Sequence, residues 1–411
     1  SESIDPTHAR IYLSPPDTGA LEHEYVLRAL DSGWVAPVGP DLNGFEDDLA
    51  ALTGWSGVAA VASGTAALHL ALLVSGVEPG DEVLVSTFTF AASANAVVHA
   101  GATPVFVDSD RTTWNMDPNL LGDVLNERRR ANRLPRAVVV TDLYGQCADY
   151  DAIVPLCREL GVAVVQDAAE AVGSTYRGRS AGTQGDIGIF SFNGNKIMTT
   201  SSGGAVLTAD REVADRVRYL ATQARQPVAQ YEHTEVGFNY RMSNLLAALG
   251  RAQLRRLPDM VDARRRTHEQ YRSALADIVD FMPLAADQHW NGWLTCIVTS
   301  SLEARDRVLE HDDPVCAAPA TDLVGDVLSQ LRVHLRVRHE LTEQHRVVGG
   351  PTPTRQRPAG NEHRVAVGTG GGVRVLVRVD LDAARTGAFD QLDHGSARAP
   401  VVRTLGLDVG R

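Results

Sequence analysis

Lysine is almost absent from this chain of 411 residues. Of the 39 Lys and Arg side chains, only Lys196 is a lysine, and all the others are arginine. Arginine solvates a surface and forms ion pairs as well as lysine does, but its guanidinium group effectively never loses its proton. A buried lysine amine can lose it and then attack a carbonyl carbon to form a Schiff base. Lys196 is therefore a candidate nucleophile, and an arginine-biased genome is the alternative explanation.

Cysteine and excess positive charge are also scarce. Cys147, Cys157, Cys296 and Cys316 are scattered, without the spacing of a metal site or of a disulfide framework, so we expect reduced thiols and no bound metal. The formal net charge is -12, so the field of the chain repels phosphate polymers and anionic lipids. These features argue against nucleic acid and membrane surfaces as partners.

Long apolar runs are missing as well. The most apolar stretch, residues 58–74, contains Ser63 and His69 and is too short and too polar to span a bilayer. The first residues carry no apolar segment typical of a signal peptide, so we expect a cytoplasmic protein. No apolar run leads into a GxGxxG turn, which makes a nicotinamide-dependent oxidoreductase an unlikely alternative.

Short β-rich runs alternate with helical patterns through the first two thirds of the chain. This alternation predicts an α/β fold with a mostly parallel, doubly wound sheet. Predicted strands are Val58–Ala62, Glu82–Thr87, Pro104–Val107, Ala137–Leu143, Ala163–Gln166, Ile187–Phe192 and Ala205–Thr208. Predicted helices are Ala66–Ser75, Ala91–Ala100, Pro118–Arg130, Tyr150–Leu160 and Arg211–Leu220.

A further helical pattern covers Ser243–Ala276, and Pro258 is expected to break it. We therefore predict a large domain over residues 1–257 and a smaller C-terminal domain over residues 258–411. From about Pro314 the chain is rich in Arg, Pro, Gly and Val, with short strand-like runs such as Val373–Val379. This tail is a divergent domain, a loop-rich extension or a sequence read out of frame, and these three interpretations stay open.

Four segments follow predicted strands and would meet at the carboxyl edge of the sheet, where open α/β sheets bind ligands. In the first, Gly64 permits close approach of the backbone and Thr65 can cap the helix that follows, so the helix N-terminus could hold a phosphate. An ordinary capped turn is the alternative. In the second, Phe88 and Phe90 are placed to stack on a flat ring or to pack in the core.

The third segment ends a strand in Asp167, with Glu170 three residues later, and the fourth joins Ser191 to Lys196 through an Asn-Gly turn. A carboxylate beside the pyridine nitrogen of pyridoxal phosphate (PLP) keeps that nitrogen protonated. At about 4 Å and an effective dielectric of about 20, the attraction is roughly 4 kcal/mol. An acid at a strand end and a unique lysine at another fit this cofactor, with Ser191 free to meet its phosphate.

These motifs resemble those of the DegT/StrS family of sugar-nucleotide aminotransferases, which are PLP enzymes with the aspartate aminotransferase fold (fold type I). The resemblance extends from about Ile11 to Tyr271. Its stretches are Ser32–Val35, Phe45–Glu46, Ser63–His69, Phe88–Phe90, Leu143–Gly145, Asp167–Glu170, Ser191–Lys196, Ser202–Gly204 and Gly237–Asn244. The stretches Asn193–Gly204, Thr222–Arg225 and Tyr231–His233 are most similar to the branch that aminates C4 of nucleotide-linked 4-keto-6-deoxyhexoses.

The resemblance implies a role for each matching residue. Lys196 is expected to form the Schiff base and to move protons, and Asp167 to pair with the pyridinium. Other expected cofactor contacts are Gly64, Thr65 and Ser191 at the phosphate, Phe90 stacked on the ring and Glu170 beside it. Asn239 is expected to reach the cofactor phosphate of a partner subunit, which implies a homodimer with shared active sites. Arg241 either holds that segment or touches substrate phosphates.

The implied reaction is transamination at C4, with L-glutamate as amino donor and dTDP-4-keto-6-deoxyglucose as the favoured acceptor. A UDP-linked 2-acetamido substrate and amination at C3 are alternatives that keep the same residues. A pyridoxamine-dependent dehydratase would have His in place of Lys196. A non-catalytic regulator with the same fold is the alternative from another class.

Two departures from the family pattern limit these expectations. Asp142 stands where the family usually has His, so substrate contacts at this position do not carry over. The C-terminal signatures of the family are missing, and nothing is carried over beyond about His311.

Overall fold

The computed structural model describes residues 13–305, 364–368 and 374–378. The chain divides into two compact units, Ser1–Glu343 and Gln344–Arg411. In the second unit, β13 (Arg364–Gly368) and β14 (Arg374–Arg378) form an antiparallel pair. The strand-like run predicted at Val373–Val379 contains β14. The rest of the atypical tail lies outside the described residues.

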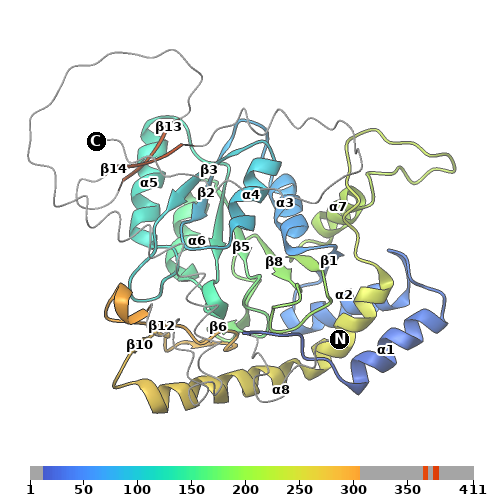
Figure 1. The fold of residues 1–411 in the computed structure, drawn as a ribbon. Helices are drawn as coiled ribbons and strands as arrows, with labels where there is room; N and C mark the ends of the chain where they lie inside the picture. Colours follow the sequence, from blue (N-terminus) through green and yellow to red (C-terminus); the bar gives the residue numbers. More distant parts are fainter. Residues whose placement is uncertain (1–12, 306–363, 369–373, 379–411) are drawn as a thin grey trace, which may run out of the picture. The chain divides into compact units, whose positions relative to one another are not determined.

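The first unit is built on a seven-stranded sheet with the order β1-β9-β8-β5-β4-β2-β3 (Figure 1). Only β9 runs antiparallel to its neighbours, so the prediction of a mostly parallel α/β sheet is confirmed. The strands are β1 (Gly57–Val61), β2 (Glu82–Ser86), β3 (Thr103–Val107), β4 (Ala137–Thr141), β5 (Ala163–Asp167), β8 (Ile187–Ser191) and β9 (Gly204–Thr208). Each lies within two residues of its predicted bounds.

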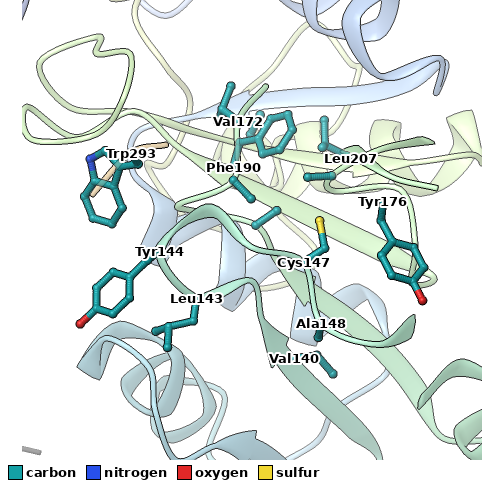
Figure 2. Packing of buried hydrophobic residues seen from close by; sticks show 14 of the residues in the cluster. Val140, Leu143, Tyr144, Cys147, Ala148, Val172, Tyr176, Phe190, Leu207 and Trp293 are labelled. Carbon is teal, nitrogen blue, oxygen red and sulfur yellow. The ribbon is translucent and has the colours of Figure 1, made fainter. Parts of the chain in front are cut away.

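The apolar runs of the strands are explained by helices that cover both faces of the sheet. Side chains alternate along a strand, so Val138 and Val140 of β4 join one core cluster while Val139 joins the other. The first cluster, part of which Figure 2 shows, includes side chains of α2 (Pro40–Thr53), α5 (Pro118–Arg130), α6 (Tyr150–Glu159) and α8 (Asn244–Leu275). The second includes those of α3 (Gly64–Val74), α4 (Ala91–His99) and α7 (Arg211–Ala221).

The expected helix break at Pro258 is wrong, because α8 continues through this proline. An internal proline costs a helix roughly 3 kcal/mol, since it removes one hydrogen bond and crowds the preceding turn. Leu257, Met260 and Val261 are buried around the proline, and α8 packs along α1 (Ala20–Asp31) and α2. Burial of this helix face offsets the local cost. The domain boundary that rested on the break stays a prediction.

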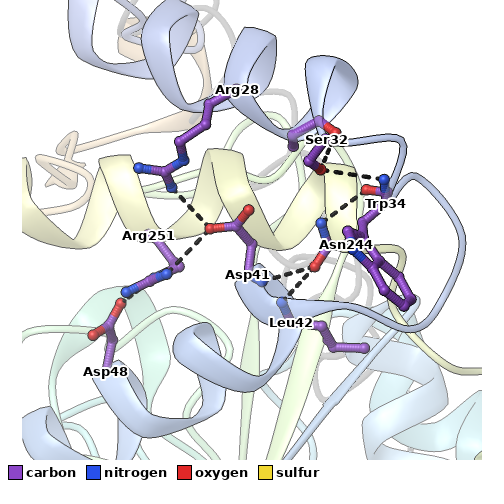
Figure 3. A network of polar contacts seen from close by, with 9 residues as sticks. Arg28, Ser32, Trp34, Asp41, Leu42, Asp48, Asn244 and Arg251 are labelled. Carbon is purple, nitrogen blue, oxygen red and sulfur yellow. Dashed lines mark hydrogen bonds and ion pairs between the residues drawn. The ribbon is translucent and has the colours of Figure 1, made fainter.

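Asn244, the first residue of α8, fixes the start of α2 from the side (Figure 3). Its Oδ1 accepts hydrogen bonds from the backbone N–H groups of Asp41 and Leu42 at 2.8 and 2.9 Å. Its Nδ2 donates to the backbone carbonyl of Trp34 at 2.8 Å. A cap supplied by a distant residue cannot be read from local sequence, and α1 and α2 were not predicted.

Between α8 and residue 298 the chain forms three strands of two residues each. β10 (Asp280–Phe281) pairs with β12 (Ile297–Val298), and β11 (Gln288–His289) joins β6 (Thr175–Tyr176) and β7 (Arg179–Ser180). The pairing with β6 brings residues 288–293 to the carboxyl edge of the large sheet. Among the described residues, no helix has both the length and the apolar character needed to cross a bilayer.

Candidate active site

The four predicted segments meet at one edge of the sheet. β8 and β5 are parallel neighbours, so Ser191 and Asp167 lie at adjacent strand ends. β1 runs in the same direction as β8, because both are antiparallel to β9. Its carboxyl end therefore leads into Gly64 and α3 beside Ser191. The sheet topology gathers candidates that are far apart in the sequence.

Lys196 is held between a carboxylate and an indole ring. The backbone N–H of Lys196 donates to the carbonyl of Asn193 at 3.0 Å, which closes the predicted Asn-Gly turn. Its Nζ lies 3.5 Å from Oε1 of Glu170 and 4.4 Å from the centroid of the Trp293 ring. The side chain is 13% exposed, so the amine is shielded from most solvent but still accessible. This setting favours a nucleophilic role over a solvated surface charge.

Asp167 is a buried carboxylate that lacks a directly paired cation. Its Oδ2 accepts a hydrogen bond from the Ser93 hydroxyl at 2.7 Å, and its Oδ1 accepts one from the backbone N–H of Ala169 at 3.2 Å. Burial raises the pKa of Asp167, while these hydrogen bonds and the charge of Lys196 lower it. In the described part of the chain, no basic side chain forms an ion pair with Asp167. A buried carboxylate without an ion-pair partner can pair with the protonated ring nitrogen of a cofactor.

Glu170 joins three parts of the site. Its Oε2 accepts the backbone N–H of Tyr144 at 2.7 Å, while Oε1 faces Lys196. Its backbone carbonyl accepts from Nδ2 of Asn291 at 2.8 Å. Glu170 therefore holds Lys196 and ties the turn after β4 to residues 288–293. Its place beside a bound ring stays a prediction.

The start of α3 forms a cradle that no side chain fills. A Cβ built on Gly64 would lie 2.7 Å from Cβ and 2.8 Å from Oγ of Ser191, so glycine is needed for this close approach. The expected cap by Thr65 is wrong, because the Ser63 hydroxyl accepts the backbone N–H of Ala66 at 3.0 Å. Thr65 lies inside the first turn, with its hydroxyl uncommitted to capping. Hydroxyl groups and a helix N-terminus suit a phosphate group.

Phe88 and Phe90 have different environments. Phe88 packs against Trp114, with ring centroids 6.1 Å apart, and edge-on against Tyr144, so it serves the core. Phe90 is the N-cap residue of α4 and is 71% exposed, which leaves its ring accessible. Stacking of Phe90 on a cofactor stays a prediction.

Asn239 is exposed and lies in the segment between α7 and α8. Its backbone forms an isolated β-bridge with Thr222, and its role toward a partner subunit stays a prediction. Arg241 pairs with Glu46 at 2.5 Å and donates to the carbonyl of Ala60 at 2.7 Å. Of the two roles considered for Arg241, these contacts favour holding the segment.

These side chains fit PLP. Lys196 offers the amine, Asp167 the unpaired buried carboxylate, and Gly64 with Ser191 the open cradle. In the described ranges, no group of His, Cys, Asp and Glu side chains has the arrangement of a metal site.

Sequence reasoning missed the residues that orient these groups. Ser93 holds Asp167, and Nε1 of Trp293 donates to the carbonyl of Asn195 at 2.8 Å, next to Lys196. Asn291 donates to the carbonyls of Glu170 and Val172. Trp293 was detectable in principle, as one of only five tryptophans and in an Asn-Gly-Trp turn. Nothing in the local sequence separates Ser93 from other helical serines.

Asp142 is buried, so its side chain is not accessible to a substrate in this structure. It is fully buried and accepts hydrogen bonds from the Tyr150 hydroxyl at 2.7 Å and from Nε2 of Gln166 at 2.6 Å. Burial raises its pKa to about 7, and the nearby Asp167 adds to this. Asp142 therefore has a structural role, because its carboxyl group links the end of β4 to Gln166 of β5 and to Tyr150 of α6.

Comparisons with known proteins identify the family of this chain. The sequence model of the DegT/DnrJ/EryC1/StrS aminotransferase family matches residues 16–314. EpsN of Bacillus subtilis (strain 168) is 48% identical over 292 residues, which cover 71% of this chain and 75% of EpsN. The GDP-perosamine synthase of Caulobacter vibrioides is 43% identical over 267 residues, which cover 65% of this chain and 70% of that enzyme.

Solved structures give the same result. The aminotransferase TlmJ from Streptoalloteichus hindustanus matches with a TM-score of 0.68 at 35% identity, covering 73% of this chain and 82% of TlmJ. Spr1654 from Streptococcus pneumoniae in its PLP form matches with a TM-score of 0.67 at 29% identity, covering 74% and 82% of the two chains.

Fold and site together define a fold type I enzyme that uses pyridoxal phosphate. The chain belongs to the DegT/DnrJ/EryC1/StrS aminotransferase family and is a PLP-dependent sugar aminotransferase. This result favours an enzyme over the non-catalytic regulator.

Proposed function

We propose that this enzyme transfers the amino group of L-glutamate to C4 of a nucleotide-activated 4-keto-6-deoxyhexose. The product would be a 4-amino-4,6-dideoxy sugar nucleotide. The observation that carries the proposal is the solitary amine of Lys196, 3.5 Å from Glu170, at the same sheet edge as the unpaired Asp167. When bound, PLP supplies an electron sink that stabilises negative charge on the carbon that loses a proton.

The residues of this chain account for the remaining work. Lys196 would hold the cofactor aldehyde between turnovers and, once released, carry a proton from the donor carbon to the cofactor. The acceptor half-reaction needs the same proton moved in the opposite direction, so one amine serves both halves. Glu170 and Trp293 restrict the Lys196 side chain to one region of the pocket.

Asp167 would keep the cofactor nitrogen protonated. Ser93 holds the Asp167 carboxylate by a 2.7 Å hydrogen bond, so its position is set before the cofactor binds. Gly64, Thr65 and Ser191 would hold the phosphate, and Phe90 would cover the ring. Asn239 would complete the phosphate site of a second subunit, so the proposal includes a homodimer. A cytoplasmic location stays a prediction.

The nucleotide carried by the acceptor sugar has several candidates. The sequence motifs favour dTDP-4-keto-6-deoxyglucose. A GDP-linked substrate is the second candidate, since three relatives that are 37–43% identical are named GDP-perosamine synthase. The UDP-linked 2-acetamido substrate and amination at C3 are retained as further outcomes.

A product analysis tests these assignments. The enzyme is incubated with PLP, L-glutamate and a panel of 4-keto-6-deoxyhexoses linked to dTDP, GDP or UDP, and the products are identified by NMR. An amine at C4 of one sugar supports the proposal. An amine at C3 overturns the regiochemistry, and bound PLP without turnover of any acceptor overturns the substrate class.

A further inference from the structure

A buried histidine links the two sets of predicted phosphate contacts. His69 lies on α3, one helical turn after Thr65, and its side chain belongs to the interior of the protein. His69 is 5% exposed, and its Nδ1 has no hydrogen-bond partner in the described structure. A buried polar atom without a partner costs about 1–3 kcal/mol. Another contribution of the imidazole, such as its ring contacts, must therefore offset this cost.

Two ring contacts of His69 are the chain neighbours of Asn239, and a third is His99, with centroids 5.9 Å apart. The imidazole packs edge-on against Phe238, with centroids 4.9 Å apart, and against Tyr240, with centroids 6.0 Å apart. Phe238 and Tyr240 stack on each other with centroids 5.0 Å apart. Asn239 lies between them in the chain and is exposed, while both neighbours are half-buried. The two rings thus pack against the protein interior, while Asn239 between them is exposed to solvent.

Backbone hydrogen bonds and isolated β-bridges, Thr222 with Asn239 and Val61 with Arg241, hold this segment in place. The N–H of Ala62 donates to the carbonyl of Tyr240 at 2.7 Å, and the N–H of Tyr240 donates to the carbonyl of Ala221 at 2.9 Å. The N–H of Phe238 donates to the carbonyl of Leu220 at 2.7 Å. The backbone of the segment is therefore fixed on both sides of Asn239, and the His69 ring contacts both aromatic side chains that flank Asn239.

We propose that His69 is a positioning residue that sets Asn239 for the cofactor phosphate of a second subunit. The inference rests on the homodimer of the proposed function. α3 would then take part in two active sites: Gly64 and Thr65 at its start serve its own subunit, and His69 one turn later serves the partner. The closing experiments read cofactor binding, so they are independent of which sugar is aminated.

The first experiment compares PLP with pyridoxal, which lacks the phosphate. Replacing His69→Ala removes the ring support, so we expect PLP affinity to fall about tenfold to hundredfold, the equivalent of a lost hydrogen bond to a charged group. Pyridoxal affinity should not change. His69→Phe keeps a ring and should restore most of the PLP affinity. His23→Ala, an exposed histidine on α1, is the matched control.

Asn239→Ala should reproduce the effect of His69→Ala, and the double variant should be no weaker than either single variant. Equal losses for PLP and pyridoxal, or additive effects of the two substitutions, would overturn the proposal. Thermal unfolding of each cofactor-free variant shows whether His69→Ala folds. If it does not, His69→Leu, which fills the space without an aromatic ring, replaces it in the same comparisons.

The second experiment asks which subunit is affected. Mixed dimers are prepared in which one subunit carries Lys196→Arg, so that only the other subunit retains a cofactor-attaching lysine. We expect weak PLP binding when His69→Ala is on the Lys196→Arg subunit, and normal binding when it is on the other subunit. The reverse pattern would place the action of His69 within its own subunit. Failure to form any dimer would also overturn the inference while leaving the C4 chemistry to the product analysis.

Discussion

At the scale of single residues, the chemistry depends on one amine. Lys196→Arg keeps the charge near Glu170 but removes the group that can attack a carbonyl. We expect transamination to be abolished and the fold to be retained. Borohydride treatment of the PLP-loaded wild type should attach the cofactor to the peptide that contains Lys196, as mass spectrometry can show.

A matched control adds a lysine where none is needed. Arg211→Lys places a second amine on the exposed first turn of α7. Borohydride should still label only the Lys196 peptide in this variant. Retained turnover in Lys196→Arg, or labelling of residue 211 in preference to Lys196, would contradict the assignment.

Asp167→Asn tests the carboxylate without changing its shape. The amide keeps the volume and can still meet Ser93, but it carries no charge to hold a proton on the cofactor nitrogen. Turnover should fall by orders of magnitude while PLP remains attached to Lys196. Steady-state kinetics with saturating glutamate measures this, and Asp123→Asn, an exposed residue on α5, is the control. A near-normal rate would show that the nitrogen needs no acidic partner.

The sequence singled out residues whose chemistry is unusual and did not separate those whose types are common. Lys196 was detectable because no other lysine exists, and Asp167 because it ends an apolar strand. Ser63 took the capping role expected of Thr65, since both types cap helices and only the backbone geometry decides between them. Trp293 comes from a segment whose pairing with β6 is non-local.

At the scale of elements, Asn244 is the clearest test of how the helices are held. Asn244→Ala removes the cap of α2 and leaves the buried backbone N–H groups of Asp41 and Leu42 without this partner. We expect a loss of about 2–4 kcal/mol in the free energy of unfolding, from the cap and the unsatisfied groups together. Urea denaturation measures it. Asn119→Ala, an exposed position on α5, should change stability by less than about 0.5 kcal/mol.

The buried carboxyl group of Asp142, which joins the end of β4 to Gln166 of β5, should make stability depend on pH. Burial raises its folded-state pKa from an ordinary 3.8 to about 7, so the folded protein binds this proton more tightly than the unfolded chain does. Its contribution to stability is therefore full below pH 3.8 and is lost as the pH rises toward 7.

Asp142→Asn should remove that dependence. The difference in unfolding free energy between variant and wild type should move in favour of the variant as the pH rises from about 4 to about 7. Urea titrations at a series of pH values measure this difference. A difference that is flat over this range, as expected for Asp123→Asn, would contradict the account.

Strands and helices were predicted correctly where an apolar run indicates burial on both faces. The prediction failed where tertiary packing outweighs a local preference. The apolar strands of the large sheet were found because both of their faces are covered. Pro258 was expected to end a helix, yet the buried Leu257 and Val261 hold α8 across it. Propensity is a weaker influence than a long packed face.

At the scale of the whole molecule, the proposed homodimer is the main prediction. Each chain has a mass of 44.2 kDa, so light scattering should give twice that value. Each dimer should bind two PLP molecules, because each subunit contributes one Lys196. Asn239→Ala is expected to leave the dimer mass unchanged while weakening PLP binding. A monomer that binds PLP with full affinity would contradict the shared site.

The position of Lys196 also makes this enzyme suitable for spectroscopy. Growth on lysine enriched in nitrogen-15 at the side-chain amine alone would label one atom, Nζ of Lys196, which lies 4.4 Å from the centroid of the Trp293 ring. Ring currents from Trp293 should shift its resonance away from that of free lysine. One NMR signal would then report the occupancy and protonation of the reaction centre directly, without any background to subtract.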